Sequence, residues 1–172
     1  MANHKQGESI WLVTWKKAHG DNHVPYDDIV EEALCFGWVD SLPRKLDENR
    51  SMLRLSPRKP GSAWSGLNKS RVENLLKAGL MQPAGLSVVA SAKDDGSWTF
   101  LDDVERLETP GDLAEALAAH PMATSHFDAF PRSVKRGILE WIKQAKRPET
   151  RAKRIEETAR LASENRRANQ FR

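Results

Sequence analysis

The stretch Pro25–Asn68, PYDDIVEEALCFGWVDSLPRKLDENRSMLRLSPRKPGSAWSGLN, decides the fold of this chain. Its first part predicts an amphipathic helix over residues 26–36, because the apolar residues recur at intervals of three and four. The acids of this segment lie in its first two turns, where they favour the positive end of the helix dipole. Gly37 follows as a natural C-terminal stop. The stretch therefore opens with one well-defined helix.

A β-hairpin is expected directly after that helix. Segments 38–45 and 51–56 are rich in strand-forming residues and flank a polar turn. Pro43 interrupts the first of these strands, which places the strand at an edge of its sheet. A second helix is expected to begin near Ser65, with the hydroxyl of Ser62 or Ser65 at the N-cap position. Helix, hairpin and helix together predict an α+β core.

Outside this stretch, residues 9–17 predict one more strand, and its apolar residues fall on both faces. This pattern is typical of a strand that is well buried. The fold class is therefore α+β, with a small antiparallel sheet, packed helices and a helical C-terminal region. We expect an α+β core over 1–100 and a basic helical region over 101–172, which is either a separate subdomain or part of the same domain. Helices in these regions are predicted over 83–92, 110–119, 131–146 and 149–163, and a short helical turn is predicted over 121–130.

Composition and length limit the class of protein. The 172 residues are 39% apolar and 30% charged, which suits a compact water-exposed domain, and no run approaches the roughly 20 apolar residues of a membrane span. Cys35 is the only cysteine, so an internal disulfide is excluded. The first residues lack the apolar core of a secretory signal. These features lead us to expect a cytoplasmic protein.

Charge is distributed unevenly along the chain. Residues 1–130 contain 14 Lys and Arg against 19 Asp and Glu, whereas residues 131–172 contain 13 against 5. A basic C-terminal segment can bind nucleic acid or an acidic partner, or it can be the solvated face of helices that balance an acidic body. The candidate nucleic-acid-binding residues are Lys135, Arg136, Lys143, Lys146, Arg147, Arg151, Lys153, Arg154 and Arg160.

The hairpin and the start of the second helix hold a candidate pocket for a small anion. Arginine side chains offer planar donors to phosphate or carboxylate, tryptophans can form walls, and backbone N–H groups at a helix start favour anions. The candidate ligand-binding residues are Trp38, Asp40, Arg54, Arg58, Trp64, Ser65 and Asn68. In the alternative interpretation, Asp40 pairs with Arg54 or Arg58 to fix the hairpin, and the tryptophans belong to the core. The partner expected from the sequence is an unidentified small anion or a protein.

No motif for catalysis or cofactor binding stands out. The sequence contains no nucleophile elbow, phosphate loop or dinucleotide fingerprint. His19 and His23 have the spacing of metal ligands on a helix, but Gly20 and Asn22 disfavour a helix there and no third ligand is near. We therefore expect neither a cofactor nor a metal. The sequence favours a non-enzymatic role.

Two long motifs carry a family resemblance. The first is YDDIVEEALCFGWVDS at 26–41, continued by RLSPRKPGSAWSGLNKSRVENLLKAGLM at 54–81. The second is the C-terminal FPRSVKRGILEWIKQAKRPETRAKRIEETARLA at 130–162. Over residues 9–163 the chain resembles the bacterial YdeI/OmpD-associated family, also called bacteriocin-protection proteins. The resemblance implies a role in stress or bacteriocin tolerance and supplies no catalytic residues.

Overall fold

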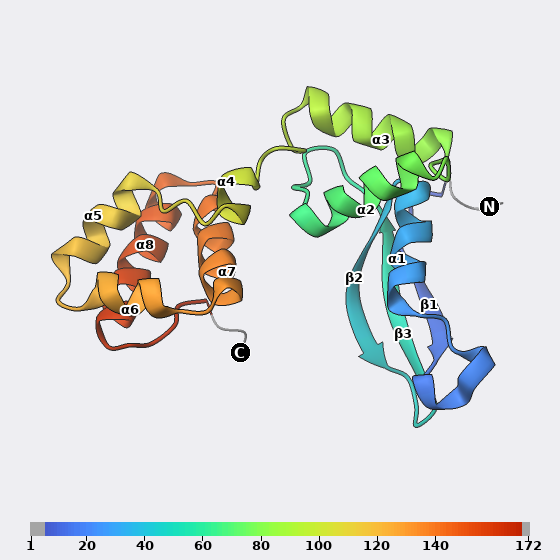
Figure 1. Ribbon diagram of the computed structural model, residues 1–172, viewed down its shortest axis with the longest axis horizontal. Helices are drawn as coiled ribbons and strands as arrows, with labels where there is room; N and C mark the ends of the chain where they lie inside the picture. The colour runs from blue at the N-terminus through green and yellow to red at the C-terminus, as the bar shows by residue number, and fades with distance from the viewer. Residues whose placement is uncertain (1–5, 170–172) are drawn as a thin grey trace. The chain divides into compact units, whose positions relative to one another are not determined.

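The computed structural model describes residues 6–169 and divides the chain into two compact units, residues 1–100 and 101–172. Figure 1 shows the two units and their labelled elements.

The first unit contains a sheet and three α-helices, so the chain is α+β as expected. Its strands and helices follow the order β1 (Ile10–Trp15), a short 3-10 helix η1 (Lys17–Asn22), α1 (Tyr26–Cys35), β2 (Trp38–Lys45), β3 (Arg50–Pro57), α2 (Gly66–Lys77) and α3 (Pro83–Asp94). The predicted helix, hairpin and second helix are all present. Gly37 ends α1 with a φ of 77°, the left-handed conformation that glycine adopts without strain.

The sheet is antiparallel in the order β1-β3-β2. β3 is the central strand, and its Arg54 lies opposite Trp11 while its Arg50 lies opposite Trp15. The pairing of β2 with β3 shifts register between Asp40 and Pro43. Pro43 therefore lies in an edge strand beside an irregularity, as the sequence indicates, because proline cannot donate to a ladder.

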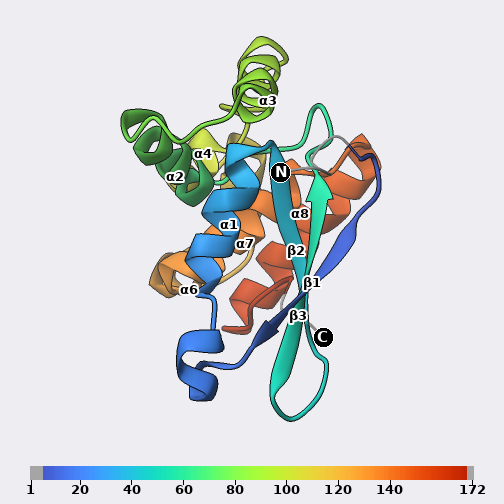
Figure 2. The ribbon, with the colours of Figure 1, turned by 90° about the vertical axis from the view of Figure 1, so that its right-hand side faces the viewer.

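Among the described residues of the first unit, one face of the sheet is covered and the other is not. Helix α1 lies beside β2 (Figure 2). It packs Ile29 and Ala33 against a small core, which also contains Trp38, Leu53 and Leu55. The prediction that the first strand is well buried is wrong. β1 is an edge strand that α1 covers on one side only, and its other face leaves Trp11, Val13 and Trp15 39%, 45% and 40% exposed.

A second core lies between α1, α2 and α3. Its buried members include Leu34, Trp64, Val72 and Val89. Gly85 of α3 lies so close to the end of α1 that a Cβ atom built there would be 2.3 Å from the Cys35 carbonyl oxygen. This close approach brings α3 and the residues that follow it toward the loop after β3.

The second unit is wholly helical in its described residues. It contains α4 (Asp102–Glu105), α5 (Gly111–Ala119), α6 (Ala123–Ala129), α7 (Arg132–Lys143) and α8 (Pro148–Ser163). Helix α8 contacts α5, α6 and α7 and is the centre of the unit. The helices expected from periodicity are present, and α4 is an addition that its four residues were too short to indicate. Across residues 6–169, no helix has both the length and the apolar character that crossing a membrane demands.

Candidate anion-binding site

Three of the predicted pocket residues lie apart from one another. Trp38 is 7% exposed and belongs to the core beneath α1. The Asp40 carboxylate accepts a hydrogen bond of 2.6 Å from the Tyr26 hydroxyl rather than from an arginine. Burial, this hydrogen bond and the Asp40 charge raise the pKa of Tyr26 to about 12. Arg54 lies on the opposite, uncovered face of the sheet, where its Nη2 donates to the Ser9 hydroxyl at 3.2 Å.

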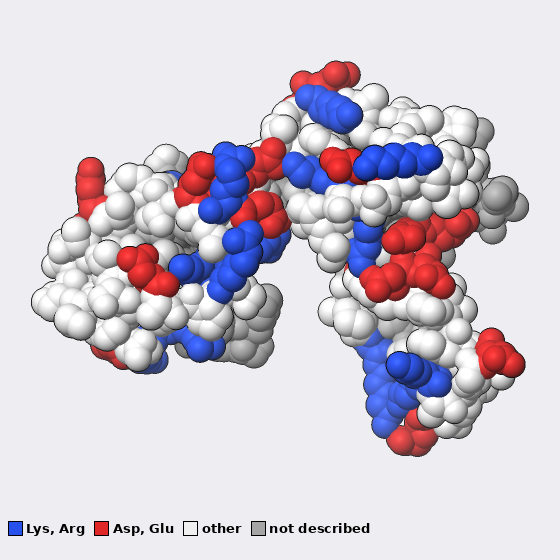
Figure 3. Space-filling model, in the orientation of Figure 1, with Lys and Arg blue, Asp and Glu red and all other residues white. Residues whose placement is uncertain are grey.

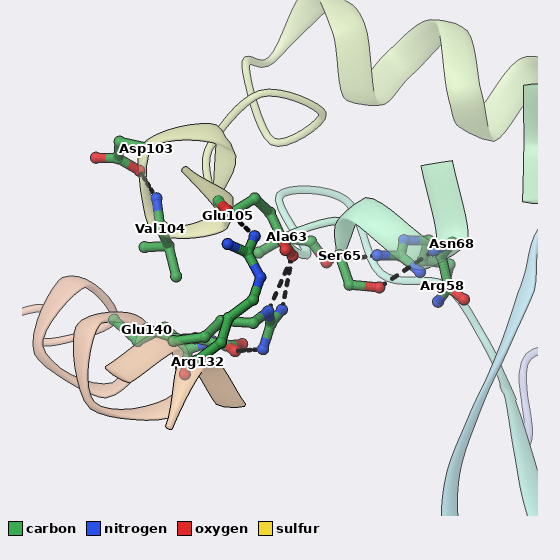
Figure 4. Close-up of polar contacts among 11 residues, drawn as sticks. Arg58, Ala63, Ser65, Asn68, Asp103, Val104, Glu105, Arg132 and Glu140 are labelled. Carbon is green, nitrogen blue, oxygen red and sulfur yellow. Dashed lines mark hydrogen bonds and ion pairs between the residues drawn. The ribbon is translucent and has the colours of Figure 1, made fainter. Parts of the chain in front are cut away.

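Ser65 and Asn68 form the N-terminal cap of α2. The Ser65 hydroxyl accepts a hydrogen bond from the backbone N–H of Asn68 at 3.3 Å (Figure 4). The Asn68 side-chain oxygen accepts a further bond from Arg71 at 3.2 Å. These contacts match the cap predicted for Ser65, and they occupy groups that the pocket hypothesis assigned to an anion.

The remaining predicted pair, Arg58 and Trp64, does come together. The Arg58 guanidinium lies over the Trp64 ring, with its central carbon 3.6 Å from the ring centroid. Its Nη2 donates to the carbonyl oxygen of Ala63 at 2.5 Å. Arg58 is 9% exposed and Trp64 1% exposed. The Nε and Nη1 atoms of Arg58 are buried and have no hydrogen-bond partner. A buried guanidinium in this unit therefore retains unused donors.

The electrostatic state of Arg58 follows from its burial. Burial lowers the pKa of Arg58 from its ordinary value to about 10, and the negative charge of Asp40 partly opposes this shift. Arg58 consequently stays positively charged at neutral pH. A buried cation without enough acceptors is costly, so nearly all such groups in proteins are paired.

A small cavity adjoins Arg58. Its volume is about 80 Å³, and its lining comes from the loop after β3, from α3 and from the turn that follows α3. The lining residues are Arg58, Lys59, Pro60, Gly61, Trp64, Ser87, Val88, Ser91, Ala92, Asp95 and Ser97. This volume suits an ion or terminal group of the size of phosphate or carboxylate.

Asp95 closes the cavity by tying two segments together. Its carboxylate accepts hydrogen bonds from the backbone N–H of Gly61 at 3.0 Å and from that of Ser97 at 2.8 Å. The Ser97 hydroxyl lies close enough to help lower the pKa of Asp95, but it makes no hydrogen bond of normal geometry and is buried. The loop at Gly61 is thereby held against the turn that follows α3, and one acid lines the same cavity as Arg58.

An aromatic pair extends from the site. The rings of Trp64 and Trp98 are 4.9 Å apart between centroids and inclined at 50°. The ammonium groups of Lys93 and Lys69 lie 5.4 Å and 5.7 Å from the Trp98 centroid. Positive charge therefore surrounds this pair. Trp98 is not among the residues that the sequence singled out.

The serines of the cavity were also missed. Ser87 and Ser91 are four residues apart on α3, so they project from the same side of that helix. This spacing was the one available signal in the sequence. It indicates a polar stripe on α3, but it does not reveal which segment faces that stripe.

Most of the candidate basic residues of the second unit make local contacts. Arg136 bridges Glu105 at 2.9 Å and Glu140 at 2.8 Å (Figure 4), and Figure 3 shows acids and bases interspersed on this unit. The other pairings are Lys135 with the Asp128 carbonyl oxygen, Lys143 with Asp103, Arg151 with Asp112, Arg154 with the Trp141 ring and carbonyl oxygen, and Arg160 with Glu164.

These contacts bear on the nucleic-acid alternative. Three candidates, Lys146, Arg147 and Lys153, make no side-chain ion pair within the described part of the chain. The acidic side chains of residues 101–130 balance much of the positive charge of the C-terminal helices. Their use as a nucleic-acid interface stays a prediction.

No metal centre is evident between residues 6 and 169. Groups of three or more His, Cys, Asp or Glu side chains placed to hold an ion are absent from this part of the chain. His19 Nε2 lies 3.2 Å from the Asn49 side-chain oxygen, and His23 Nδ1 lies 2.8 Å from the Trp15 carbonyl oxygen. The two histidines thus have separate local contacts.

Fold and site together define an α+β protein of two units whose distinctive polar feature is a buried arginine beside a small cavity. The chain belongs to the family described as Domain of unknown function (DUF8412), whose match covers residues 1–88, just over half of the chain. Residues 106–165 match the family described as Bacteriocin-protection, YdeI or OmpD-Associated. No curated protein and no solved structure matches the chain.

The match over 106–165 confirms the YdeI/OmpD-associated resemblance, and it covers the C-terminal motif. The N-terminal motif at 26–41 and most of its continuation fall within the other family's match. The chain therefore combines two family regions, which correspond closely to the sheet-containing unit and the helical unit.

Proposed function

We propose that the N-terminal unit binds a small anion, of the size and charge of phosphate or a carboxylate, at Arg58. The observation that carries this proposal is the buried guanidinium with two N–H-bearing nitrogens, Nε and Nη1, that lack an acceptor beside a cavity of about 80 Å³. An anion there would gain charge-assisted hydrogen bonds, which are about twice as strong as those between neutral groups. It would also neutralise the buried charge.

The neighbouring groups support the same ligand class. Ser87, Ser91 and Ser97 are among the residues that line the cavity, and a serine hydroxyl can donate to an anionic oxygen. Trp64 supports one face of the guanidinium and fixes its plane. The Asp95 carboxylate repels a second negative charge near it, so the ligand oxygens should lie close to Arg58 rather than to Asp95. These features favour an anionic group whose main charged contact is Arg58.

A thermal-shift experiment on the full chain tests this proposal. Phosphate, sulfate and acetate are compared with chloride at constant ionic strength, because a ligand that binds only the folded state raises the melting temperature. We expect one of the oxyanions to stabilise the wild type and to have no such effect on Arg58→Met, which keeps apolar bulk on Trp64. Arg54→Met is the matched control, since Arg54 lies on the other face of the sheet.

Two results would overturn the proposal. The first is an equal response of Arg58→Met and the wild type to every oxyanion. The second is the absence of any oxyanion-specific shift in the wild type, which would mean that Arg58 only packs on Trp64 and that water occupies the cavity.

We further propose that the protein is cytosolic, acts without catalysis and contributes to stress or bacteriocin tolerance. Support for the tolerance role comes from the description of the family that residues 106–165 match. A deletion strain should be more sensitive to bacteriocin or envelope stress, and the wild-type gene should restore its survival. Unchanged survival of the deletion strain would contradict this role.

A further inference from the structure

The uncovered face of the sheet has a definite composition. Strand alternation and the observed register place on it one set of side chains, from all three strands. We call this set the open sheet face: Trp11, Val13, Trp15, Val39, Arg44, Arg50, Met52, Arg54 and Ser56. Helix α1 covers the opposite side through Leu53 and Leu55. The open sheet face is distinct from the Arg58 cavity, which lies beyond the end of β3.

Two indoles dominate the open sheet face. Trp11 and Trp15 are 39% and 40% exposed, which is unusual for the largest apolar side chain. They are four residues apart on one strand, so a rise of about 3.3 Å per residue places them roughly 13 Å from each other. Val13 and Met52 lie between them as a cross-strand pair. The face thus offers two separated aromatic platforms joined by an apolar floor.

Each platform is paired with an arginine. The Arg44 guanidinium lies 5.1 Å from the Trp11 ring centroid, and that of Arg50 lies 5.7 Å from the Trp15 centroid. Arg54, directly opposite Trp11, is also exposed. Asp47 in the hairpin turn pairs with Arg50 at 2.7 Å. Figure 3 shows Lys and Arg side chains gathered over the β2–β3 hairpin.

The open sheet face carries charge of one sign only among the described residues. Its strand positions hold three arginines and, among the described residues, no acid. A face with this charge is complementary to a polyanion. A second copy of the chain is a poor occupant, because a two-fold contact would set the same arginines against one another. An occupant must therefore bring negative charge and flat groups able to stack on indoles.

We propose that the open sheet face binds single-stranded nucleic acid. Bases would stack on Trp11 and Trp15, while Arg44 and Arg54 contact the phosphates. Sheet surfaces with exposed aromatic residues suit unstacked bases, and stacking on an aromatic ring is tolerant of sequence. A duplex fits less well, because its base faces are already stacked. The binding is expected to be weakly selective for sequence and strongly dependent on salt.

Fluorescence anisotropy with labelled oligonucleotides of about 8 nucleotides tests the proposal on the full chain. Single-stranded RNA, single-stranded DNA and a duplex of the same sequence are titrated at about 50 and 200 mM salt. We expect the single strands to bind more tightly than the duplex and to lose affinity in the higher salt. Quenching of tryptophan fluorescence should accompany binding.

Variants assign the binding to this face. Trp11→Leu/Trp15→Leu should weaken single-strand binding about tenfold or more while keeping apolar bulk. Arg44→Gln/Arg54→Gln should reduce the salt dependence, by about one unit in the slope of log K against log salt concentration. This second variant keeps both indoles, so it serves as an independent test should the tryptophan variant fold poorly. Lys77→Gln, on α2, is the matched control and should bind normally. Lys146→Gln/Lys153→Gln, in the C-terminal unit, is the control for the alternative interface on the C-terminal helices.

Several results would overturn the proposal. They are the absence of salt-sensitive binding to any single strand, equal affinity for the duplex, and binding that survives loss of both indoles in a folded variant. Loss of binding in the Lys146 and Lys153 control would assign the activity to the C-terminal helices instead. A concentration-dependent dimer that dissociates in the tryptophan variant would show that the face joins two copies of the chain.

Discussion

Replacing Gly85 by alanine would set a methyl group against the backbone of another helix. The added Cβ would lie 2.3 Å from the carbonyl oxygen of Cys35 and 2.8 Å from that of Leu34, where α3 crosses the end of α1. A carbon and an oxygen normally come no closer than about 3.3 Å, so α3 would have to move by roughly 1 Å. The Cys35 oxygen also accepts a hydrogen bond of 3.1 Å from the Gln82 N–H, which the movement would disturb.

Two opposing effects set the magnitude. Alanine favours a helix over glycine by at most about 1 kcal/mol. Overpacking a well-filled site costs about 1–3 kcal/mol, and the upper end applies here because the obstacle is backbone rather than a flexible side chain. We therefore expect Gly85→Ala to lower the free energy of unfolding of the first unit by about 2 kcal/mol. For a unit of about 100 residues this corresponds to a fall of roughly 8–16 °C in melting temperature.

Gly137 in α7 provides the matched control. A Cβ atom built at Gly137 meets no atom within 4 Å, so only the helix preference changes. Gly137→Ala should raise the stability of the second unit by about 0.5–1 kcal/mol. Thermal and urea unfolding would be followed by far-UV circular dichroism, with tryptophan fluorescence to report on the first unit, which holds five of the six tryptophans.

One outcome would refute the steric argument directly. If Gly85→Ala were as stable as the wild type or more so, then α3 would be free to shift away from α1. The close approach would then have no role in positioning α3 beside the cavity.

The remaining predictions concern single side chains. The pKa of Tyr26 is raised from 10.0 to about 12, so its protonated form stabilises the fold below pH 10, and this contribution is lost as pH rises through about 12. Between pH 10 and about 12, the free energy of unfolding measured in urea should fall less for Tyr26→Phe than for the wild type. Arg58 has a lowered pKa and acts in the opposite direction, but it does so in both proteins. Burial and nearby acids raise the pKa of the Cys35 thiol, so a thiol reagent should label it at mildly alkaline pH only after unfolding; rapid labelling of the native protein would contradict this. Arg136→Met should destabilise the second unit by about 1–2 kcal/mol because it removes the bridge to Glu105, and urea titration at low and high salt should show a smaller effect in high salt.

Local patterns explain why much of the fold was predictable. The helix at 26–36 and the cap at Ser65 depend on residues within a few positions of each other, so their signals are complete in a short segment. The hairpin is equally local. The burial of β1 was not predictable in this way, because it depends on how many layers cover the sheet, and only α1 supplies one. The apolar residues on both faces of segment 9–17 indicated that a second layer covers the face away from α1, and the described structure of this unit contains no such layer.

The site was predictable only in part for a related reason. Arg58 and Trp64 are six residues apart, and the sequence grouped them in one candidate anion site, which stays a prediction. Their cavity partners lie about thirty residues later on α3 and beyond, so the contact depends on the packing of whole helices. Arg54 was grouped with Arg58 because the two are close in sequence. Alternation along β3 nevertheless sends Arg54 to the face opposite Leu53 and Leu55.

The position of β1 at the edge of the sheet has a consequence for the handling of this protein. In the described structure its outer rim pairs with no other strand, and its six residues, IWLVTW, contain no proline, glycine or charge. Short segments of this composition are templates for intermolecular strand pairing and amyloid-like aggregation. The other rim, β2, is protected by Pro43 and its irregular register. Lys16 and Lys17, directly after β1, are placed as gatekeepers whose replacement by neutral residues should lower solubility during refolding.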